Sequence, residues 1–256
     1  MTPWARFVLA AGATALAALY MSTSHSSVII QGTRFVYPAE EEEIVVRIQN
    51  KGSLPSLVQT WLDDGNVRAT PTTAKAPFNA TPPIFRIEPN EQQAVRVRYT
   101  GEPLPQDRES LYWLNVLEVQ PKPVNAGGRN LIELSFRTRL RVFYRPQGLP
   151  FERAAATSKL TWKLIPYQGG YAVEVANPTP YYISLPSTQL VVSKTGERFA
   201  KAPNREENDS LMLPSGDVKR FMLPGLRTLP AGEKEIEFTE MTDFGARVKH
   251  SVDLKN

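Results

Sequence analysis

The sequence predicts an all-β protein built from two consecutive β-sandwiches. Short apolar runs alternate with turn residues roughly every eight to twelve positions, a spacing typical of sandwich strands. Prolines are spread through the chain and outnumber glycines by 22 to 15, which disfavours long helices because proline has no backbone N–H to donate. With 256 residues, 41% of them hydrophobic, the chain is long enough for two domains that each bury a core.

The expected strands follow one another through both halves of the chain. In the first domain, residues 27–146, they cover 28–36, 44–50, 57–66, 82–90, 92–101, 110–119 and 131–146, with a loop at 121–130. In the second domain, residues 147–256, they cover 160–167, 171–177, 180–185, 189–192, 220–226, 235–241 and 246–254. The run RPQGLP contains the proline and glycine typical of a linker and joins the two halves.

Residues 1–26 are predicted to be a secretory signal peptide. Arg6 is the only charge in this stretch, and an apolar run rich in Ala and Leu extends from Phe7 to Met21. A short basic start, an apolar centre and an exit of small residues are the features of such peptides. The cut site is open, because Ala15-Leu16-Ala17 satisfies the small-x-small rule and so do the serines between 22 and 27. A membrane anchor is the alternative, but the run is shorter than the ~20 residues that a span needs.

Composition excludes several kinds of chemistry. The chain has no cysteine, which rules out disulfides, thiol catalysis and thiolate metal sites, and its only histidines are His25 and His250. No motif places a nucleophile beside a base, so we expect no enzymatic activity, no cofactor and no metal. The net charge of +4 comes from basic residues interleaved with acidic ones, a pattern that does not predict a nucleic-acid partner.

The stretch 131–146 is unusually long for a strand. Its even positions carry Ile132, Leu134, Phe136, Leu140, Val142 and Tyr144, and its odd positions carry Glu133, Arg137, Arg139, Arg141 and Arg145. This alternation puts the apolar and charged side chains on opposite faces, and sixteen residues at ~3.3 Å each would reach about 50 Å. Either the strand bends and keeps its apolar residues inside, or Ile132–Phe136 face a partner. The pattern alone favours neither.

Several motifs resemble those of periplasmic pilus-assembly chaperones of the chaperone/usher pathway, such as the P-pilus and type 1 pilus chaperones. They are, in the family's order, GTRFVYP, NKGSLPSLVQTW, ATPPIFRIEP, LPQDRESLYWLNV, RTRLRVFYRP, NPTPYYISL and TDFGAR. The resemblance covers nearly the whole chain after the signal segment. It implies two immunoglobulin-like domains set at an angle with a cleft between them, and a chaperone in fimbrium biogenesis that works in the periplasm without enzymatic activity.

The resemblance also implies which residues would bind the C-terminal carboxylate of a pilus subunit. They are Arg34, in GTRFVYP, and Arg141, in RTRLRVFYRP. The family usually has lysine at the second position, so Arg141 replaces a compact ammonium group by a planar guanidinium with several N–H donors. Arg139 is the rival if the register differs by two residues. We expect both cations to be accessible to solvent in the empty cleft.

By the same resemblance, Ile132, Leu134 and Phe136 would fill the hydrophobic groove of an incomplete subunit, which is donor-strand complementation. An outer-membrane usher would then receive the subunit. Independently of the resemblance, an exposed apolar strand could allow the free protein to self-associate. Glu109, Arg145 and Asp243 would form a salt-bridge network that holds the domain angle.

The alternative is a secreted adhesion or carbohydrate-binding module that recognises its ligand through loops. Such a module would need neither the two arginines nor the long apolar strand.

Overall fold

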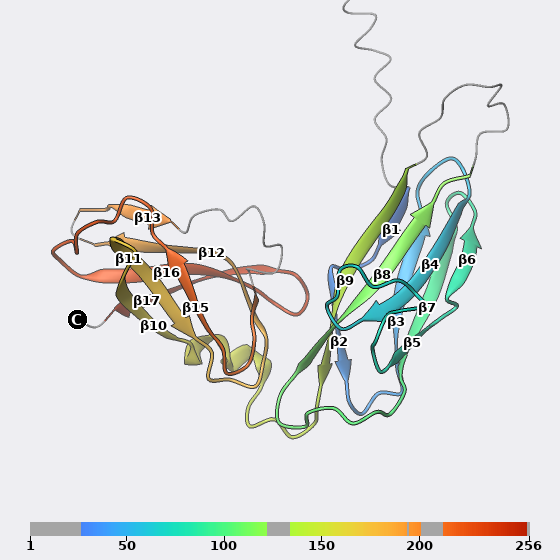
Figure 1. The fold of residues 1–256 in the computed structure, drawn as a ribbon, viewed down its shortest axis with the longest axis horizontal. Coiled ribbons are helices and arrows are strands. Elements are labelled where there is room, and N and C mark those ends of the chain that lie inside the picture. The colour runs from blue at the N-terminus through green and yellow to red at the C-terminus, as the bar shows by residue number, and fades with distance from the viewer. Residues whose placement is uncertain (1–26, 122–133, 194, 201–211, 255–256) are drawn as a thin grey trace, which may run out of the picture.

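The structure is a computed structural model that describes residues 27–121, 134–193, 195–200 and 212–254. The predicted signal peptide therefore lies outside the described residues. Strands dominate the described chain, and its helices are two short 3-10 turns, Arg153–Ala155 and Thr157–Lys159. Figure 1 shows two groups of strands, β1–β9 and β10–β17, joined by a single connection. The predicted all-β class is confirmed.

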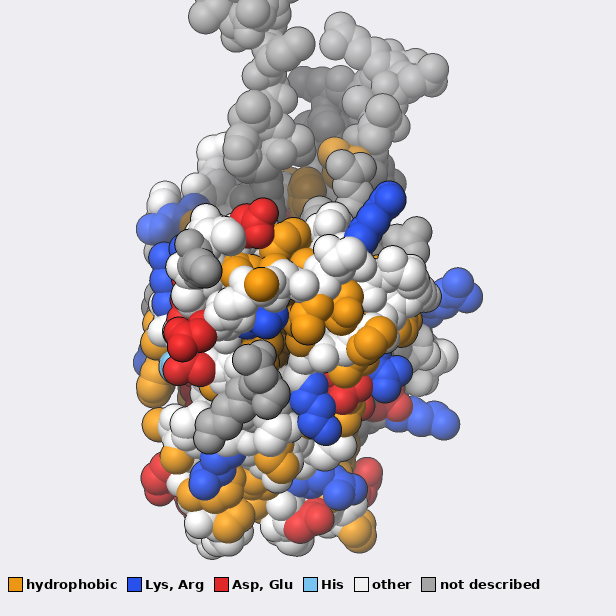
Figure 2. Space-filling model, turned by 90° about the vertical axis from the view of Figure 1, so that its left-hand side faces the viewer, with side chains coloured by type: hydrophobic (Ala, Val, Ile, Leu, Met, Phe, Trp, Pro, Cys, Tyr) orange, Lys and Arg blue, Asp and Glu red, His pale blue; other side chains and the backbone are white. Residues whose placement is uncertain are grey.

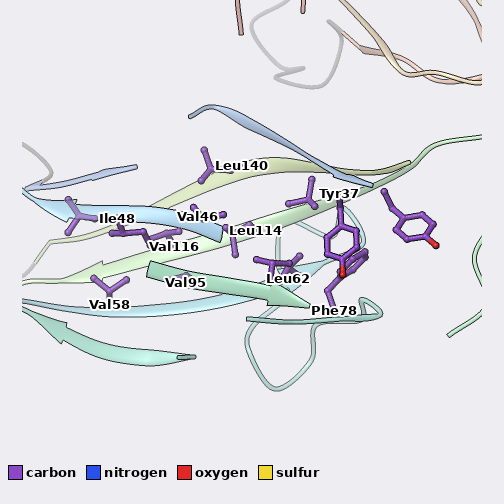
Figure 3. Packing of buried hydrophobic residues seen from close by; sticks show 14 of the residues in the cluster. Tyr37, Val46, Ile48, Val58, Leu62, Phe78, Val95, Leu114, Val116 and Leu140 are labelled. Atoms are coloured by element: carbon purple, nitrogen blue, oxygen red, sulfur yellow. The ribbon is translucent and has the colours of Figure 1, made fainter. Parts of the chain in front are cut away.

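The first group of strands forms two sheets that face each other. Its members are β1 (Val28–Ile30), β2 (Arg34–Pro38), β3 (Glu43–Asn50), β4 (Ser56–Asp63), β5 (Phe78–Thr81), β6 (Ile84–Ile87), β7 (Gln92–Tyr99), β8 (Ser110–Val119) and β9 (Ser135–Arg145). The strand orders are β1-β3-β7-β5 and β2-β9-β8-β4-β6. Alternating side chains from both sheets fill the space between them (Figure 3), as the two-residue period of a strand requires.

The second group is also a sandwich. It contains β10 (Thr161–Tyr167), β11 (Gly170–Ala176), β12 (Ile183–Val192), β13 (Arg198–Ala200), β14 (Met212–Leu213), β15 (Val218–Met222), β16 (Lys234–Met241) and β17 (Arg247–Leu254). One sheet has the order β10-β11-β15, and the other has β13-β12-β16-β17 with β14 paired to β12. Its core is separate from that of the first sandwich.

Two predicted strand boundaries are wrong for identifiable reasons. The stretch 28–36 is two strands in different sheets, because the chain turns at Gly32, whose φ of +118° suits glycine alone. Conversely, the two strands expected at 180–185 and 189–192 are one strand, β12, with a register shift between Ser184 and Ser187. Pro186 lies inside that irregularity, where a missing N–H donor is tolerated. The unpredicted β5, β13 and β14 have only four, three and two residues.

The long strand β9 has different neighbours along its length. It pairs antiparallel with β8 from Ser135 to Tyr144, but β2 pairs parallel with it only over Arg141–Arg145. Within the described residues no strand pairs with the second edge of residues 135–140. One edge of β9 is therefore open at the end where the chain enters the strand.

Candidate functional site

The parallel pairing of β2 with β9 places two cations side by side. Arg34, the first residue of β2, lies opposite Arg141 of β9 in the register. The pKa of the Arg34 guanidinium is lowered to about 10, first by burial and then by the positive charge of Arg141, while the Asp243 carboxylate acts in the opposite direction. The two predicted anchor residues are thus brought together, in a place that disfavours two positive charges without an anion.

Arg34 reaches across to the second domain. Its Nη1 donates a hydrogen bond to the carbonyl oxygen of Met241 at 3.1 Å, and its Nη2 lies 2.8 Å from the Met241 sulfur. Only 7% of Arg34 is exposed, so the expectation of a solvent-accessible side chain is wrong for this residue. The reason is that β16 of the second domain ends at Met241 and covers the guanidinium. Among the described residues, no acceptor bonds the buried Nε of Arg34.

Aromatic rings lie beneath both cations. The Arg141 guanidinium is 4.9 Å from the centre of the Trp113 ring, and the Arg34 guanidinium is 5.9 Å from that of Phe143. Trp113 and Phe143 are buried with Met212 of the second domain in a small cluster where the two domains meet. Such stacking orients a guanidinium plane while its edge keeps N–H donors for a ligand.

Arg139, the rival anchor, also stacks on Trp113, at 4.7 Å, but its guanidinium bonds a different partner. Its Nη2 donates to the fully buried Asp63 carboxylate at 2.6 Å. Arg137, two residues earlier, donates to Asn115 Oδ1 and to the carbonyl oxygens of Val67 and Ala69. These partners lie within the first domain. The arginine that is beside Arg34 is Arg141.

The predicted groove-filling residues lie where β9 leaves the core. Leu140 is buried between the sheets, Phe136 is half-buried, and Leu134 is 51% exposed just before the strand begins. The apolar stripe therefore passes from the core to the surface, beside the open edge of the strand. Ile132 lies outside the described residues.

The predicted salt-bridge residues also come together. Arg145 donates from Nε to Glu109 Oε1 at 2.7 Å and from Nη2 to Asp243 Oδ2 at 2.8 Å. The second oxygen of Glu109 accepts the backbone N–H of Tyr182 at 2.7 Å. Burial raises the pKa of Glu109, and the positive charge of Arg145 and the Tyr182 N–H oppose that rise. Because Asp243 and Tyr182 belong to the second domain, these contacts join the two domains.

The network extends through residues that the sequence did not reveal. The buried Arg153 donates to Glu240 Oε1 at 2.8 Å, and its Nε lies 3.9 Å from Asp243 Oδ1. Glu240 also contacts His250 Nε2 at 3.1 Å. No local pattern marks Arg153, which lies between Glu152 and a run of three alanines. Arg153 lies near Oδ1 of Asp243, whereas Arg145 bonds Oδ2.

Replacing Asp243 with alanine is expected to lower the free energy of unfolding by about 1–2 kcal/mol, because it removes an anion shared by two arginines at a half-buried site. Glu109→Ala should act in the same direction, since it leaves the Tyr182 N–H without its acceptor. Thermal melts and solution scattering would measure stability and the domain angle. Glu174→Ala, which breaks an ion pair with the exposed Arg220, is the control. Unchanged melts and scattering in both interface variants would contradict a role in holding the domains.

The surface of the second domain shows mixed charge. Figure 2 shows basic, acidic and apolar side chains interspersed on the drawn face, without one continuous basic area. Where residues are described, no helix has the length and apolar character to span a membrane. That same part of the chain contains no group of three or more His, Asp or Glu side chains placed to hold a metal.

Comparison with known proteins identifies both halves. Residues 27–150 match the family model of the pili and flagellar-assembly chaperone, PapD N-terminal domain, and residues 155–252 match the pili assembly chaperone PapD, C-terminal domain. The chaperone protein FimB/FhaD of Bordetella pertussis is 38% identical over 96% of this chain and 96% of its own length.

Two solved structures share the whole fold. The Pseudomonas aeruginosa CupB2 chaperone is 35% identical with a TM-score of 0.71, over 89% of this chain and 100% of the other. The Salmonella enterica SafB chaperone, solved in complex with the SafA pilin, is 27% identical with a TM-score of 0.69, over 91% and 99%. With two family models that together span most of its length, the chain belongs to the family of pilus-assembly chaperones.

Proposed function

We propose that this protein holds pilus subunits in the periplasm by donor-strand complementation and delivers them to an outer-membrane usher. The observation that carries the proposal is the position of the two arginines at the point where the second edge of β9 becomes open. A partner strand can pair along residues 135–140, and its terminal carboxylate can lie between Arg34 and Arg141. The protein acts as a binding partner and not as an enzyme.

Pairing along the edge of β9 is β-augmentation, in which backbone hydrogen bonds supply affinity and alternate side chains supply fit. From Arg141 back to Leu134, just before the strand, the chain makes seven residue steps, or about 23 Å when extended. The carboxylate fixes the register of the added strand, since a slip of one residue would turn every side chain to the other face. In the fixed register, Leu134 and Phe136 reach the subunit's apolar groove, and Ile132 extends the same stripe.

Binding of the carboxylate requires Arg34 to release Met241. In the free protein, Arg34 bonds a carbonyl oxygen and a thioether, which are neutral acceptors. A hydrogen bond to a charged group contributes about 1.5–3 kcal/mol, compared with about 0.5–1.5 kcal/mol for a neutral one. A carboxylate therefore competes favourably for the guanidinium, and Arg141 adds a second cation.

The relatives support the proposed partner. The Salmonella enterica SafB chaperone was solved with a pilin bound, and the shared fold extends over nearly all of both chains. By that similarity we assign fimbrial subunits as the partner here. Membership of a chaperone family argues against the adhesion-module alternative, which has no need of paired arginines at an open strand edge.

Tagged protein isolated from the periplasm is expected to carry fimbrial subunits with it, identified by mass spectrometry. A copy that lacks residues 1–26 should stay in the cytoplasm and capture none, because its subunits would be in another compartment. Subunits recovered equally with both copies, or absent from the periplasmic copy, would contradict the proposal.

A further inference from the structure

Glu118 of β8 is a buried carboxylate at the end of the first sandwich, 2% exposed. It lies opposite Phe136 in the β8–β9 register. Its oxygens accept the backbone N–H groups of Ser27 at 3.2 Å and Val28 at 3.3 Å, and the hydroxyl of Ser56 at 3.1 Å. The Ser27 hydroxyl and the Gln120 amide also donate to it. Ser27 thus contributes two of the five hydrogen-bond donors that these described residues offer to Glu118.

Ser27 is held firmly where the first strand begins. Its carbonyl oxygen accepts the Lys51 N–H at 2.7 Å, and its hydroxyl lies 3.0 Å from that of Ser56. A Cβ on Gly52 would lie 2.4 Å from the Ser27 Cβ, so only glycine allows this approach. The nitrogen of Ser27 is therefore fixed beside the Glu118 carboxylate by contacts on several sides.

This arrangement suits an α-ammonium group. While residue 27 continues from residue 26, its nitrogen is an amide with one hydrogen and no charge. As a free N-terminus it carries three hydrogens and a positive charge, and a buried carboxylate is stabilised by such a partner. The sequence provides small residues, Ser24 and Ser26, at the third and first positions before the bond between residues 26 and 27.

We propose that the exported chain is cut between Ser26 and Ser27, and that the α-ammonium of Ser27 then binds the Glu118 carboxylate. A peptidase hydrolyses the bond: the C–N bond breaks, water adds its hydroxyl to the Ser26 carbonyl carbon, and the Ser27 nitrogen gains protons. A cut after Ala17 would instead leave nine further residues before Ser27, whose nitrogen would stay an uncharged amide. The ion pair anchors β1 beside the end of β9 that we assign to subunit binding.

The first test is the N-terminal sequence and intact mass of the protein isolated from the periplasm. We expect a chain that begins at Ser27. A chain that begins at Ala18, or at any other residue, would overturn the assignment of the cut. The inference rests on the export that we propose above, and the two fail differently: absence of the protein from the periplasm would contradict export itself, whereas a periplasmic chain that is uncut or cut elsewhere would contradict only the Ser27 site.

The second test examines the ion pair between the Ser27 α-ammonium and Glu118 independently of where the peptidase cuts. Two otherwise identical proteins, beginning at Ser27 or at Ser26, would be compared by thermal melting. We expect the Ser27 form to melt about 2–4 °C higher, and we expect that difference to disappear when both carry Glu118→Gln. An equal difference in the Glu118→Gln background, or none in the unmodified proteins, would overturn the ion pair.

A third measurement needs no Glu118 variant, so the ion pair can be tested even if Glu118→Gln does not fold. The α-amine of Ser27 can be labelled with ¹³C-methyl groups and titrated by nuclear magnetic resonance. An adjacent carboxylate raises the pKa of an amine above the usual value of about 7.7–8.0. Among the described side chains that hydrogen-bond Ser27, the ionisable one is that of Glu118. A pKa at or below the usual value would contradict the proposed contact.

Discussion

Replacing Arg141 with alanine is expected to weaken subunit capture about 30- to 150-fold. The incoming carboxylate would lose one of its two cations, and a charge-assisted contact of this kind contributes ~2–3 kcal/mol. The fold should survive, because the Arg141 side chain stacks on Trp113 at the edge of the core without filling it. Co-expression with a cognate subunit, followed by pull-down and titration, would measure the loss.

Three further variants are needed to interpret that result. Arg141→Lys keeps the charge that the family usually places here and should retain most of the capture. Arg98→Ala removes an exposed arginine from β7, in the other sheet, and should bind as the unmodified protein does. Arg34→Ala should lose capture like Arg141→Ala and also lose its contact with Met241. Wild-type capture by both the Arg34 and Arg141 variants would show that the carboxylate binds elsewhere.

A variant of Arg139 tests the alternative register, in which Arg139 and not Arg141 binds the carboxylate. Arg139→Ala is not a neutral control, because Arg139 is the closest guanidinium to the buried Asp63 and its loss is expected to lower stability. Capture must therefore be measured on the folded fraction. If folded Arg139→Ala fails to bind while Arg141→Ala binds normally, the anchor is Arg139 and the register is shifted by two residues.

Leu134→Glu is expected to abolish capture for a different reason, with a loss of at least about 100-fold, or roughly 3 kcal/mol. Both arginines remain, but a carboxylate must enter an apolar groove, where an unpaired charge is costly. The free protein should be unaffected, because Leu134 is exposed. Leu134→Ala should lose less, since it removes apolar area without adding a charge.

The matched control is Leu229→Glu. Leu229 is 53% exposed, slightly more than Leu134 at 51%, but it lies in the second domain outside the strands. It should leave both melting and capture unchanged. If Leu134→Glu captures subunits as well as Leu229→Glu does, the exposed end of the β9 stripe does not enter the groove.

Features that depend on neighbouring residues in the chain could be predicted from the sequence. The alternation over 131–146 predicts a long strand with two different faces, which is β9. The motif resemblance implies that Arg34 and Arg141 act together, and the β2–β9 register places them opposite each other. The division of β1 from β2 was missed, because it depends on the backbone angle of the single residue Gly32. The single strand β12 was likewise predicted as two strands, because Pro186 interrupts its pattern at the register shift.

The contacts that could not be predicted from the sequence lie where the two domains meet. Nothing near Arg34 in the chain indicates that Met241, more than two hundred residues later, covers it. Arg153 and Glu240 likewise gain their roles from the packing of one domain against the other. A charged residue that is buried by tertiary contacts has no signature of its own in a single sequence.

In the binding mode proposed above, the point where β2 stops covering β9 determines which polypeptides the protein can accept. Only a chain whose last residue lies at that point can offer a carboxylate to Arg34 and Arg141. An internal strand, or a subunit with residues appended at its end, has an uncharged amide there and gains no charge-assisted contact. Under this proposal, binding at this edge would depend on the natural C-terminus of the subunit, and polypeptides truncated during synthesis would be bound out of register or not at all.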